Sequence, residues 1–306
     1  MRLLVTGASG FVGRHLFAAL PRGVEWTGLS RRGCENSLAV DVLDACGLRS
    51  VVRRTRPHAV LHLAAIAQSR DDGELLHKVN VDGAVQVAEA TWSEAPAARL
   101  VVVSTGYVHG ETVNAADETA PLAPIGPYAT SKADMERALG RLGGGRSLHI
   151  VRPFNHTGPG QSPDYAVAAF ARKVAELDRL APELEVGDLT AVRDLSDVRD
   201  LARILAWLCT TPEPPKRLNV CSGVGRPMGA VLEALLALSP VPRAAVGVVT
   251  RGRSALRRSV GDPALCRRVV PVVPRPWAET LADIWAEAQA KSLSTGSRTS
   301  RKPQLK

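Results

Sequence analysis

The chain has 306 residues, of which 45% are hydrophobic and 23% charged, which suits one large α/β unit or a nucleotide-binding domain with a smaller lobe. No apolar run approaches the roughly 20 residues of a membrane-spanning helix, and the first predicted strand starts at Arg2, leaving no room for a signal peptide, so we expect a cytoplasmic protein. The net charge of +9 raises the question of nucleic acid, but aromatic residues make up only 4% and do not alternate with basic ones, which argues against a base-stacking surface.

A glycine-rich turn follows the first predicted strand, residues 2–6, and precedes a predicted helix at 11–20. Glycines at positions 7 and 10 would let a phosphate approach the main chain, and the one at position 13 would let the helix lie close to the strand. The free N–H groups at the helix start favour a pyrophosphate. We therefore expect cofactor contacts from Gly7, Ser9, Gly10, Phe11, Val12 and Gly13.

The second predicted strand, residues 24–29, leads into Ser30, Arg31 and Arg32, where the adenosine ribose of a dinucleotide should lie. An acidic residue there would bind the ribose hydroxyls and repel a 2′-phosphate, whereas serine followed by arginines does the reverse. This favours NADP over NAD; the alternative is a solvated turn. Asp41 and Val42, after the next short strand, are expected at the adenine edge.

Strands and helices alternate through the first half of the chain, which predicts an α/β fold with a doubly wound parallel sheet of the Rossmann type. Looser helical segments near 164–179, 197–210, 228–238 and 278–290 suggest a smaller α/β lobe. We expect the nucleotide-binding domain at 1–154 and 190–222, the substrate lobe at 155–189 and 223–290, and a disordered basic tail at 291–306. The predicted elements of the first half are strands at 58–63, 99–104 and 147–151 and helices at 44–54, 74–91 and 128–141.

The five cysteines and seven histidines are scattered, without the spacing of a metal site. An odd number of widely separated cysteines also fits no disulfide framework. We expect reduced cysteines and no metal.

Tyr128 and Lys132 lie four residues apart, which puts a phenol and an ammonium on one face of a helix. A nearby ammonium would help to lower the pKa of the phenol from about 10. Ser104 and Thr105 end the preceding strand, where both hydroxyls would face the same site. Together these residues indicate proton transfer beside a bound dinucleotide.

These motifs resemble the extended short-chain dehydrogenase/reductase family, the NAD(P)-dependent nucleotide-sugar epimerases, dehydratases and reductases, over about residues 2–288. Further matching segments are His62–Ala65, Asn80 with its neighbours, Arg152–Pro159, Arg193–Asp200 and Asn219–Gly223. The segments 152–161 and 193–200 most resemble reductases and dehydratases of GDP-linked 4-keto-6-deoxy sugars.

The resemblance implies a role for each matching residue. Tyr128 would be the acid/base, Lys132 would hold the nicotinamide ribose, and Thr105 would bind the substrate oxygen, with Ser104 as the second candidate. Further expected cofactor contacts are Leu63, Ala64, Ala65, Asn80, Arg152 and Phe154. The expected substrate contacts are Thr105, Gly106, Tyr107, Asn155, Lys173 and Arg193, the last three at the diphosphate; a structural role of Arg193 at a helix end stays open.

Dehydratases of this family carry an acid/base pair directly after the strand-end threonine, whereas this chain has Gly106 and Tyr107. Dehydration is therefore disfavoured. His109 is either a second acid or, as we favour, a packed histidine. We expect NADPH-dependent reduction of the 4-keto group of a GDP-linked 4-keto-6-deoxy sugar. The alternatives are an epimerase or dehydratase of the same family, or a catalytically silent NADP-binding regulator.

Family members pair through two helices, one of which carries the tyrosine and the lysine. We therefore expect a homodimer, with Met135, Ala138 and Leu139 on the outer face of the helix at 128–141.

Overall fold

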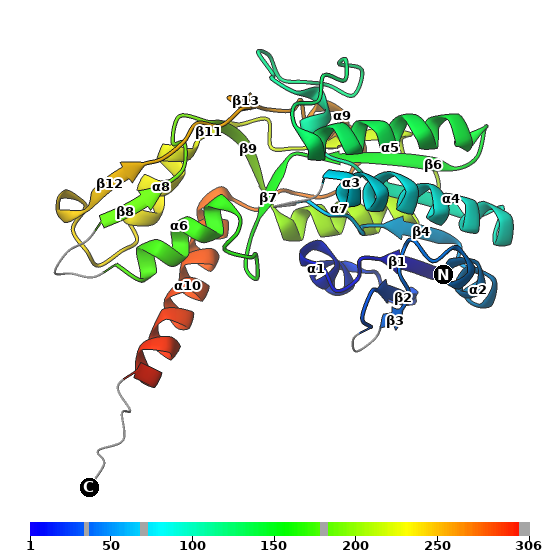
Figure 1. Cartoon of the computed structure of the whole chain (residues 1–306), viewed down its shortest axis with the longest axis horizontal. Helices are drawn as coiled ribbons and strands as arrows, with labels where there is room; N and C mark the ends of the chain where they lie inside the picture. Colours follow the sequence, from blue (N-terminus) through cyan, green and yellow to red (C-terminus); the bar gives the residue numbers. More distant parts are fainter. Residues whose placement is uncertain (34–36, 68–72, 178–182, 300–306) are drawn as a thin grey trace, which may run out of the picture.

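The computed structural model describes residues 1–33, 37–67, 73–177 and 183–299. Figure 1 shows a larger part built on a parallel sheet and a smaller lobe beside it, with strands β7 (Asn155–Thr157) and β9 (Val192–Asp197) between the two. Helix α10 (Trp277–Thr299) leaves the small lobe and ends away from the body of the molecule.

The larger part contains a seven-stranded sheet in which all strands run parallel, with the order β10-β6-β5-β4-β1-β2-β3. This confirms the predicted fold class. The strand order changes direction at β1, so the turn after β1 lies where open α/β sheets bind their ligands. The strands are β1 (Arg2–Thr6), β2 (Glu25–Ser30), β3 (Ser37–Ala39), β4 (Ala59–His62), β5 (Arg99–Val103), β6 (Leu148–Pro153) and β10 (Arg217–Val220).

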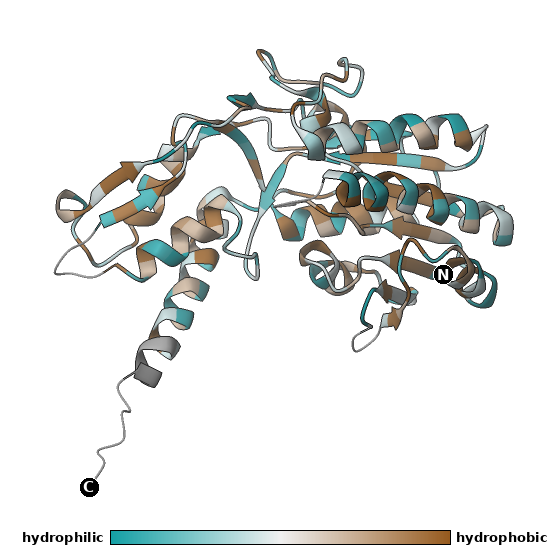
Figure 2. Cartoon of the chain, viewed as in Figure 1, coloured by the Kyte–Doolittle hydropathy of each residue, from teal (hydrophilic) through white to brown (hydrophobic). Residues whose placement is uncertain are grey.

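Helices cover both faces of this sheet. Side chains of β1 alternate between the two apolar cores: Leu3 and Val5 pack with α1 and α7, and Leu4 packs with α2, α4 and α5. Burial on both faces requires nearly continuous apolar strands, and Figure 2 shows such brown strands beside two-toned helices. The helices are α1 (Phe11–Ala19), α2 (Ala45–Thr55), α4 (Gly83–Glu94), α5 (Pro127–Gly143) and α7 (Val198–Thr210).

The helix predicted at 74–91 is interrupted. It consists of α3 (Gly73–His77), a π-helical turn η1 (Lys78–Asp82) and α4. Three short elements of the larger part were not predicted: strand β10, the 3₁₀ turn η2 (Gly106–His109) after β5, and α9 (Ala264–Val269).

The small lobe has its own apolar core, formed by α6, α8, α10 and the strands beside them. Strand β9 pairs with β7, β11 and β13, and β8 pairs with β12. The expected domain boundary at residue 190 placed β9 with the large sheet, whereas its pairing partners are strands of the small lobe. The elements are β7 (Asn155–Thr157), α6 (Ala166–Ala175), β8 (Glu183–Val186), β9 (Val192–Asp197), β11 (Gly225–Pro227), α8 (Met228–Leu236), η3 (Arg243–Ala245), β12 (Gly247–Thr250), β13 (Arg258–Ser259) and α10 (Trp277–Thr299).

Two expectations about the surface need correction. Residues 291–299, expected to be disordered, continue helix α10, and residues 300–306 lie outside the described ranges. Met135 and Leu139, expected on an outer face, are both 0% exposed and pack in the core beneath α5. The outer face of α5 therefore does not carry the apolar stripe on which the dimer was argued. Among the helices of the described ranges, none has both the length and the apolar character needed to cross a bilayer.

Candidate active site

The glycine turn after β1 is tightly packed on one side and open on the other. Gly7 has φ +71°, and a Cβ there would lie 2.6 Å from the backbone nitrogen of Ala64. A Cβ on Gly13 would lie 2.3 Å from the carbonyl oxygen of Ala8, so this glycine does let α1 lie close to the strand end. Ser9 and Gly10 are exposed.

The start of α1 offers free backbone donors. Gly10 is the N-cap residue, and no side chain accepts a hydrogen bond there from the first turn of the helix. Phe11 and Val12, in that first turn, are half-buried. Uncapped N–H groups beside a glycine turn fit an anionic pyrophosphate.

The end of β2 carries two arginines on the surface. Arg31 and Arg32 are exposed, and neither donates a hydrogen bond to another described residue. Ser30 and Ser37 share a hydrogen bond of 2.9 Å between their hydroxyl groups. The residues present therefore fit a phosphorylated ribose.

Most of the other residues predicted to contact the dinucleotide form contacts within the protein. Asp41 Oδ1 accepts a hydrogen bond of 2.9 Å from the Leu43 N–H, and Val42 is 7% exposed, with its side chain in the core. Leu63 and Ala64 donate backbone hydrogen bonds to Thr6 and so fasten the 63–65 loop beside the glycine turn. Ala65 is exposed.

Asn80 fixes the loop that follows β4 by hydrogen bonds to its backbone. It lies on the π-helical turn η1 and is 0% exposed. Its side chain accepts from the Ile66 N–H at 2.8 Å and donates to the Ile66 carbonyl at 3.0 Å and to Ser131 Oγ at 3.0 Å. This side chain thereby links the loop to α5, and its contact with the cofactor stays a prediction.

One face of α5 carries Tyr128, Lys132 and Glu136 at intervals of four residues. Lys132 is 2% exposed, and its Nζ donates a hydrogen bond of 2.8 Å to the carbonyl oxygen of Val103, the last residue of β5. The strand end thereby fixes the ammonium group in place.

Ser104 and Thr105, the two residues after β5, contact the other two side chains on that face of α5. Ser104 Oγ donates to Glu136 Oε1 at 2.5 Å, and the Thr105 hydroxyl lies beside the phenol of Tyr128. Successive residues of an extended chain point to opposite sides, so only one of the two hydroxyls can face the phenol. The structure therefore favours Thr105 and removes Ser104 as the second candidate.

The protonation of this site differs from the expectation. Burial is the main cause that raises the pKa of Tyr128 above its usual value; the nearby Tyr165 and Tyr107 raise it further, and the hydrogen bond with Thr105 lowers it. Burial also lowers the pKa of Lys132 to about 8, and Glu136 opposes that effect. Lys132 does not contribute to the pKa shift of the phenol, and the pKa of Tyr128 is raised instead of being lowered as expected.

A pocket of about 440 Å³ opens beside the phenol. Tyr107, Asn155 and Arg193 line it, as expected for substrate contacts. Asn155 Nδ2 donates to the Tyr107 hydroxyl at 2.7 Å, and its buried Oδ1 has no partner in the described structure. Tyr128 does not line the pocket itself but lies beside Tyr107 and Tyr165, which do.

Arg193 is held firmly at the pocket wall. Its Nη2 donates to Ser254 Oγ at 2.7 Å and to the Leu256 carbonyl at 2.6 Å. Arg193 sits on β9, so the suggested structural role at a helix end is replaced by bracing of the 254–257 segment. Lys173 does not line the pocket, because its ammonium donates to the carbonyl oxygen of Glu185.

Three other predicted residues lie in the core. Phe154 is 2% exposed, and a Cβ on Gly106 would lie 2.6 Å from its ring. Arg152 is 3% exposed and forms a buried ion pair with Glu136, with 2.7 Å between Nη2 and Oε2. His109 is 4% exposed and stacks on Phe154. Arg152 is thus a core residue whose contact with the cofactor stays a prediction, and His109 is the packed histidine that the sequence favoured.

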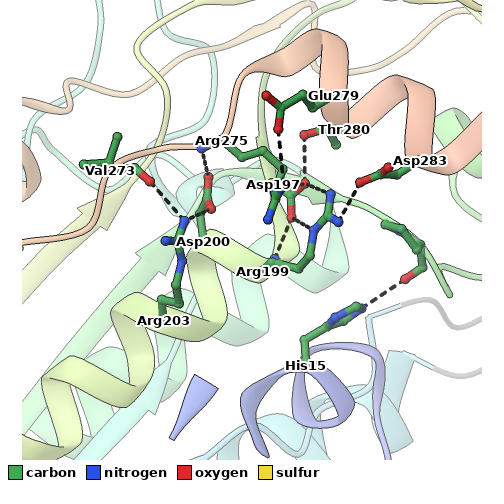
Figure 3. A network of polar contacts seen from close by, with 11 residues as sticks. His15, Asp197, Arg199, Asp200, Arg203, Val273, Arg275, Glu279, Thr280 and Asp283 are labelled. Carbon is green, nitrogen blue, oxygen red and sulfur yellow. Dashed lines mark hydrogen bonds and ion pairs between the residues drawn. The ribbon is translucent and has the colours of Figure 1, made fainter. Parts of the chain in front are cut away.

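The acidic residues of the segment 193–200 stabilise the fold. Asp194 is 0% exposed and accepts hydrogen bonds from the backbone of Ser222 and Gly223. Asp197 caps α7 and accepts from Arg199 and, at 2.7 Å, from Thr280 of α10 (Figure 3).

The same network continues along α7. Asp200 Oδ2 accepts from the Arg275 N–H at 2.7 Å, and its other oxygen is paired with Arg203 (Figure 3). These contacts tie the start of α7 to the segment that leads into α10.

The two parts of the molecule also meet at the glycine-turn helix. Phe11 stacks on His156 with 6.1 Å between ring centroids, and His15 is hydrogen-bonded to the Pro159 carbonyl at 3.0 Å (Figure 3). Arg14 donates to the carbonyl oxygen of Gly160 at 3.0 Å. The helix that would bind the pyrophosphate therefore also positions the loop that follows Asn155.

A family model described as the NAD dependent epimerase/dehydratase family matches residues 3–221. The chain belongs to this family. The match covers the glycine turn, both arginines after β2 and the helix that carries Tyr128 and Lys132, and it confirms the resemblance to extended short-chain dehydrogenases/reductases.

Characterised relatives modify nucleotide sugars. GDP-6-deoxy-D-mannose reductase of Pseudomonas aeruginosa is 32% identical over 272 residues, which cover 85% of this chain and 87% of the relative. GDP-6-deoxy-D-talose 4-dehydrogenase of Aggregatibacter actinomycetemcomitans is 28% identical, over 78% of this chain and 80% of the relative.

Solved structures of family members have the same fold. The structure of RMD from Pseudomonas aeruginosa complexed with NADPH is 28% identical, with a TM-score of 0.82, and the match covers 95% of this chain and 99% of that one. UDP-glucose 4-epimerase of Thermus thermophilus in complex with NAD is 30% identical, with a TM-score of 0.82, and the match covers 94% and 99%. Family members thus bind either dinucleotide.

Sequence reasoning missed several residues that the structure brings to the site. Glu136 continues the four-residue spacing of Tyr128 and Lys132, so helical periodicity could have found it. Tyr165 and the pocket residues 187–188 and 251–254 come from loops, for which the sequence offered no comparable signal.

Proposed function

We propose that this protein reduces the 4-keto group of a GDP-linked 4-keto-6-deoxy sugar with NADPH. The observation that carries the proposal is the Thr105 hydroxyl beside the phenol of Tyr128, with Gly106 and Tyr107 following Thr105 where dehydratases hold an acid/base pair. Without a carboxyl group in those positions, the site is suited to reduction and poorly suited to elimination.

The protonation of Tyr128 supports the reductive direction. A phenol with a raised pKa keeps its proton at neutral pH, so it can give that proton to the oxygen of a ketone that is being reduced. Oxidation of an alcohol, with which epimerases begin, requires a phenolate in the same place. Thr105 would hold the substrate oxygen by a second hydrogen bond.

The cofactor would supply the hydride when bound. Gly7 to Gly13 and the start of α1 would hold its pyrophosphate, and Lys132 its nicotinamide ribose. The exposed Arg31 and Arg32 favour NADPH, because a guanidinium pairs well with a 2′-phosphate.

The sugar nucleotide would occupy the pocket beside Tyr107. Arg193 would pair with its diphosphate, and the unpartnered Oδ1 of Asn155 would accept a hydroxyl proton. Arg253, which also lines the pocket and is exposed, offers a second cation in place of Lys173. The GDP assignment is supported by the two relatives that act on GDP-linked sugars.

The direct test measures NADPH oxidation with 4-keto-6-deoxy sugars linked to GDP, UDP, CDP and dTDP. We expect turnover with the GDP-linked substrate and a preference for NADPH over NADH. Tightly bound NAD after purification, with no net NADPH consumption on any keto sugar, would instead indicate an epimerase. NADP binding with no turnover of any kind would indicate a silent regulator.

The homodimer remains a prediction from the family resemblance alone. Light scattering at micromolar concentration measures it, and a monomer would contradict it.

A further inference from the structure

The proposed reaction leaves one buried charge beside the site without a role. The Glu136 side chain is 4% exposed and lies one helical turn beyond Lys132 on the same face of α5. Arg152 donates to its carboxylate from Nη2 at 2.7 Å and from Nε at 3.0 Å, and Ser104 donates at 2.5 Å. These donors hold the carboxylate fixed in position.

Lys132 needs such a neighbour. Burial disfavours its ammonium form, and the group donates its one strong hydrogen bond to a neutral acceptor, the Val103 carbonyl. At four residues' spacing on a helix the Cβ atoms lie about 5–6 Å apart, so the Glu136 carboxylate, although it forms its ion pair with Arg152, lies near enough to Lys132 for the two charges to interact.

The other titratable groups around this pair do not supply a negative charge. His62 of β4 is buried, and burial, helped by the Lys132 charge, lowers its pKa to about 3, so it is neutral. Arg152 of β6 is positive and paired with Glu136, and the pKa of His109 is lowered by burial. Among the described residues, Glu136 is the group whose charge raises the pKa of Lys132.

We propose that Glu136 is a positioning residue that keeps Lys132 protonated through its charge, while Arg152 and Ser104 hold the carboxylate in place. The inference rests on the proposed function only for the role that Lys132 plays in the reaction. It predicts that the charge of Glu136, rather than its shape, sets the pH at which Lys132 loses its proton.

The test follows Lys132 directly by NMR of the full chain with ¹³C-labelled lysine. The sequence has only seven lysines, so a K132R spectrum assigns the signal. In E136Q we expect Lys132 to titrate about one pH unit lower than in the wild type, or more. Because E136Q leaves Arg152 buried without its partner, the double variant E136Q/R152M is measured beside it and should also titrate lower.

Two matched variants keep the negative charge. In E136D, and in S104A, which leaves the ion pair between Glu136 and Arg152 intact, Lys132 should titrate close to its wild-type value. An unchanged Lys132 titration in E136Q or in E136Q/R152M would overturn the proposal.

Kinetics separate this inference from the proposed function. In E136Q the alkaline limb of kcat/KM for NADPH oxidation should move to lower pH by the same amount as the Lys132 signal; a limb that stays in place would contradict the role in the reaction. A shifted NMR titration with no turnover on any keto sugar would leave the link between Glu136 and Lys132 standing and remove the reductase assignment.

Discussion

At the scale of single residues, the site gathers all three tyrosines of the chain. Tyr128 is half-buried, and its phenol lies beside Tyr107 and Tyr165 at the pocket. The three phenols give the reacting centre hydrogen-bonding groups and apolar surface, and the proton available for transfer is that of Tyr128, beside the Thr105 hydroxyl.

Replacing Tyr128 by phenylalanine removes that proton and little else. We expect kcat to fall by roughly 10²–10⁴-fold, the usual contribution of a positioned acid. The dissociation constant of NADPH, measured by fluorescence titration, should stay within about twofold. Unchanged turnover would show that the proton comes from another group.

The pH dependence of the reaction should follow Lys132. Its pKa is lowered by burial to about 8, so the ammonium is present below that pH and lost above it. Tyr128 keeps its proton throughout this range, because its pKa is raised. We expect kcat/KM to decline above about pH 8 in a steady-state profile; a profile that stays flat to pH 10 would contradict a role for the lysine charge.

Cofactor choice should depend on Arg31 and Arg32. Hydrogen bonds to charged groups contribute about 1.5–3 kcal/mol, so R31A/R32A should weaken NADPH binding by roughly 10–100-fold and leave NADH binding nearly unchanged. R22A removes another exposed arginine and serves as the control. Equal losses for both dinucleotides would assign these arginines to general stability instead.

At the scale of elements, the network around Asp197 joins α7 to α10 (Figure 3). Burial alone would raise the pKa of this carboxyl, but hydrogen bonds from Arg199 and Thr280 outweigh it and the pKa is lowered. Its contribution to stability is therefore complete above roughly pH 4 and is lost as the pH falls below that value.

D197N should lower the free energy of unfolding by about 3–5 kcal/mol at neutral pH, because it leaves Arg199 facing a neutral partner in a largely buried site. D283N breaks the more exposed pair with the same arginine and should cost about 0–1 kcal/mol. Urea unfolding of the two variants provides the comparison, and equal losses would mean that burial of the Asp197 pair does not matter.

The sequence predicted elements and motifs well wherever the cause was local. The glycine turn, the parallel strands and the four-residue spacing on α5 all follow from short-range pattern. It failed where the outcome depended on which face a side chain takes: Ser104, Met135 and Leu139 were each expected toward a site or partner and are buried instead. The buried ion pair of Arg152 could not be predicted for a related reason, because its partner Glu136 lies on another element.

At the scale of the whole molecule, α1 connects the cofactor turn with the substrate pocket. Arg14 and His15 contact the carbonyl groups of residues 159–160, a few residues after Asn155. Glu287 of α10 accepts from the Gly160 N–H at 2.7 Å and holds the same loop from the other side. The shape of the pocket wall therefore depends on α1.

The double variant R14A/H15A removes both hydrogen bonds from α1 to that loop. Since each contributes about 0.5–1.5 kcal/mol, KM for the sugar nucleotide should rise at least about fivefold. NADPH affinity should change less than twofold, because neither side chain belongs to the glycine turn. A larger effect on NADPH than on the sugar would contradict this coupling.

Strand β9 limits how the molecule can be re-engineered. It carries a pocket arginine near one end and the cap of α7 at the other, and it pairs with three strands that come from distant parts of the chain. A chimera that borrowed another relative's specificity loops would have to import β9 with its three neighbours. Moving β9 without these neighbours would leave its edges unpaired.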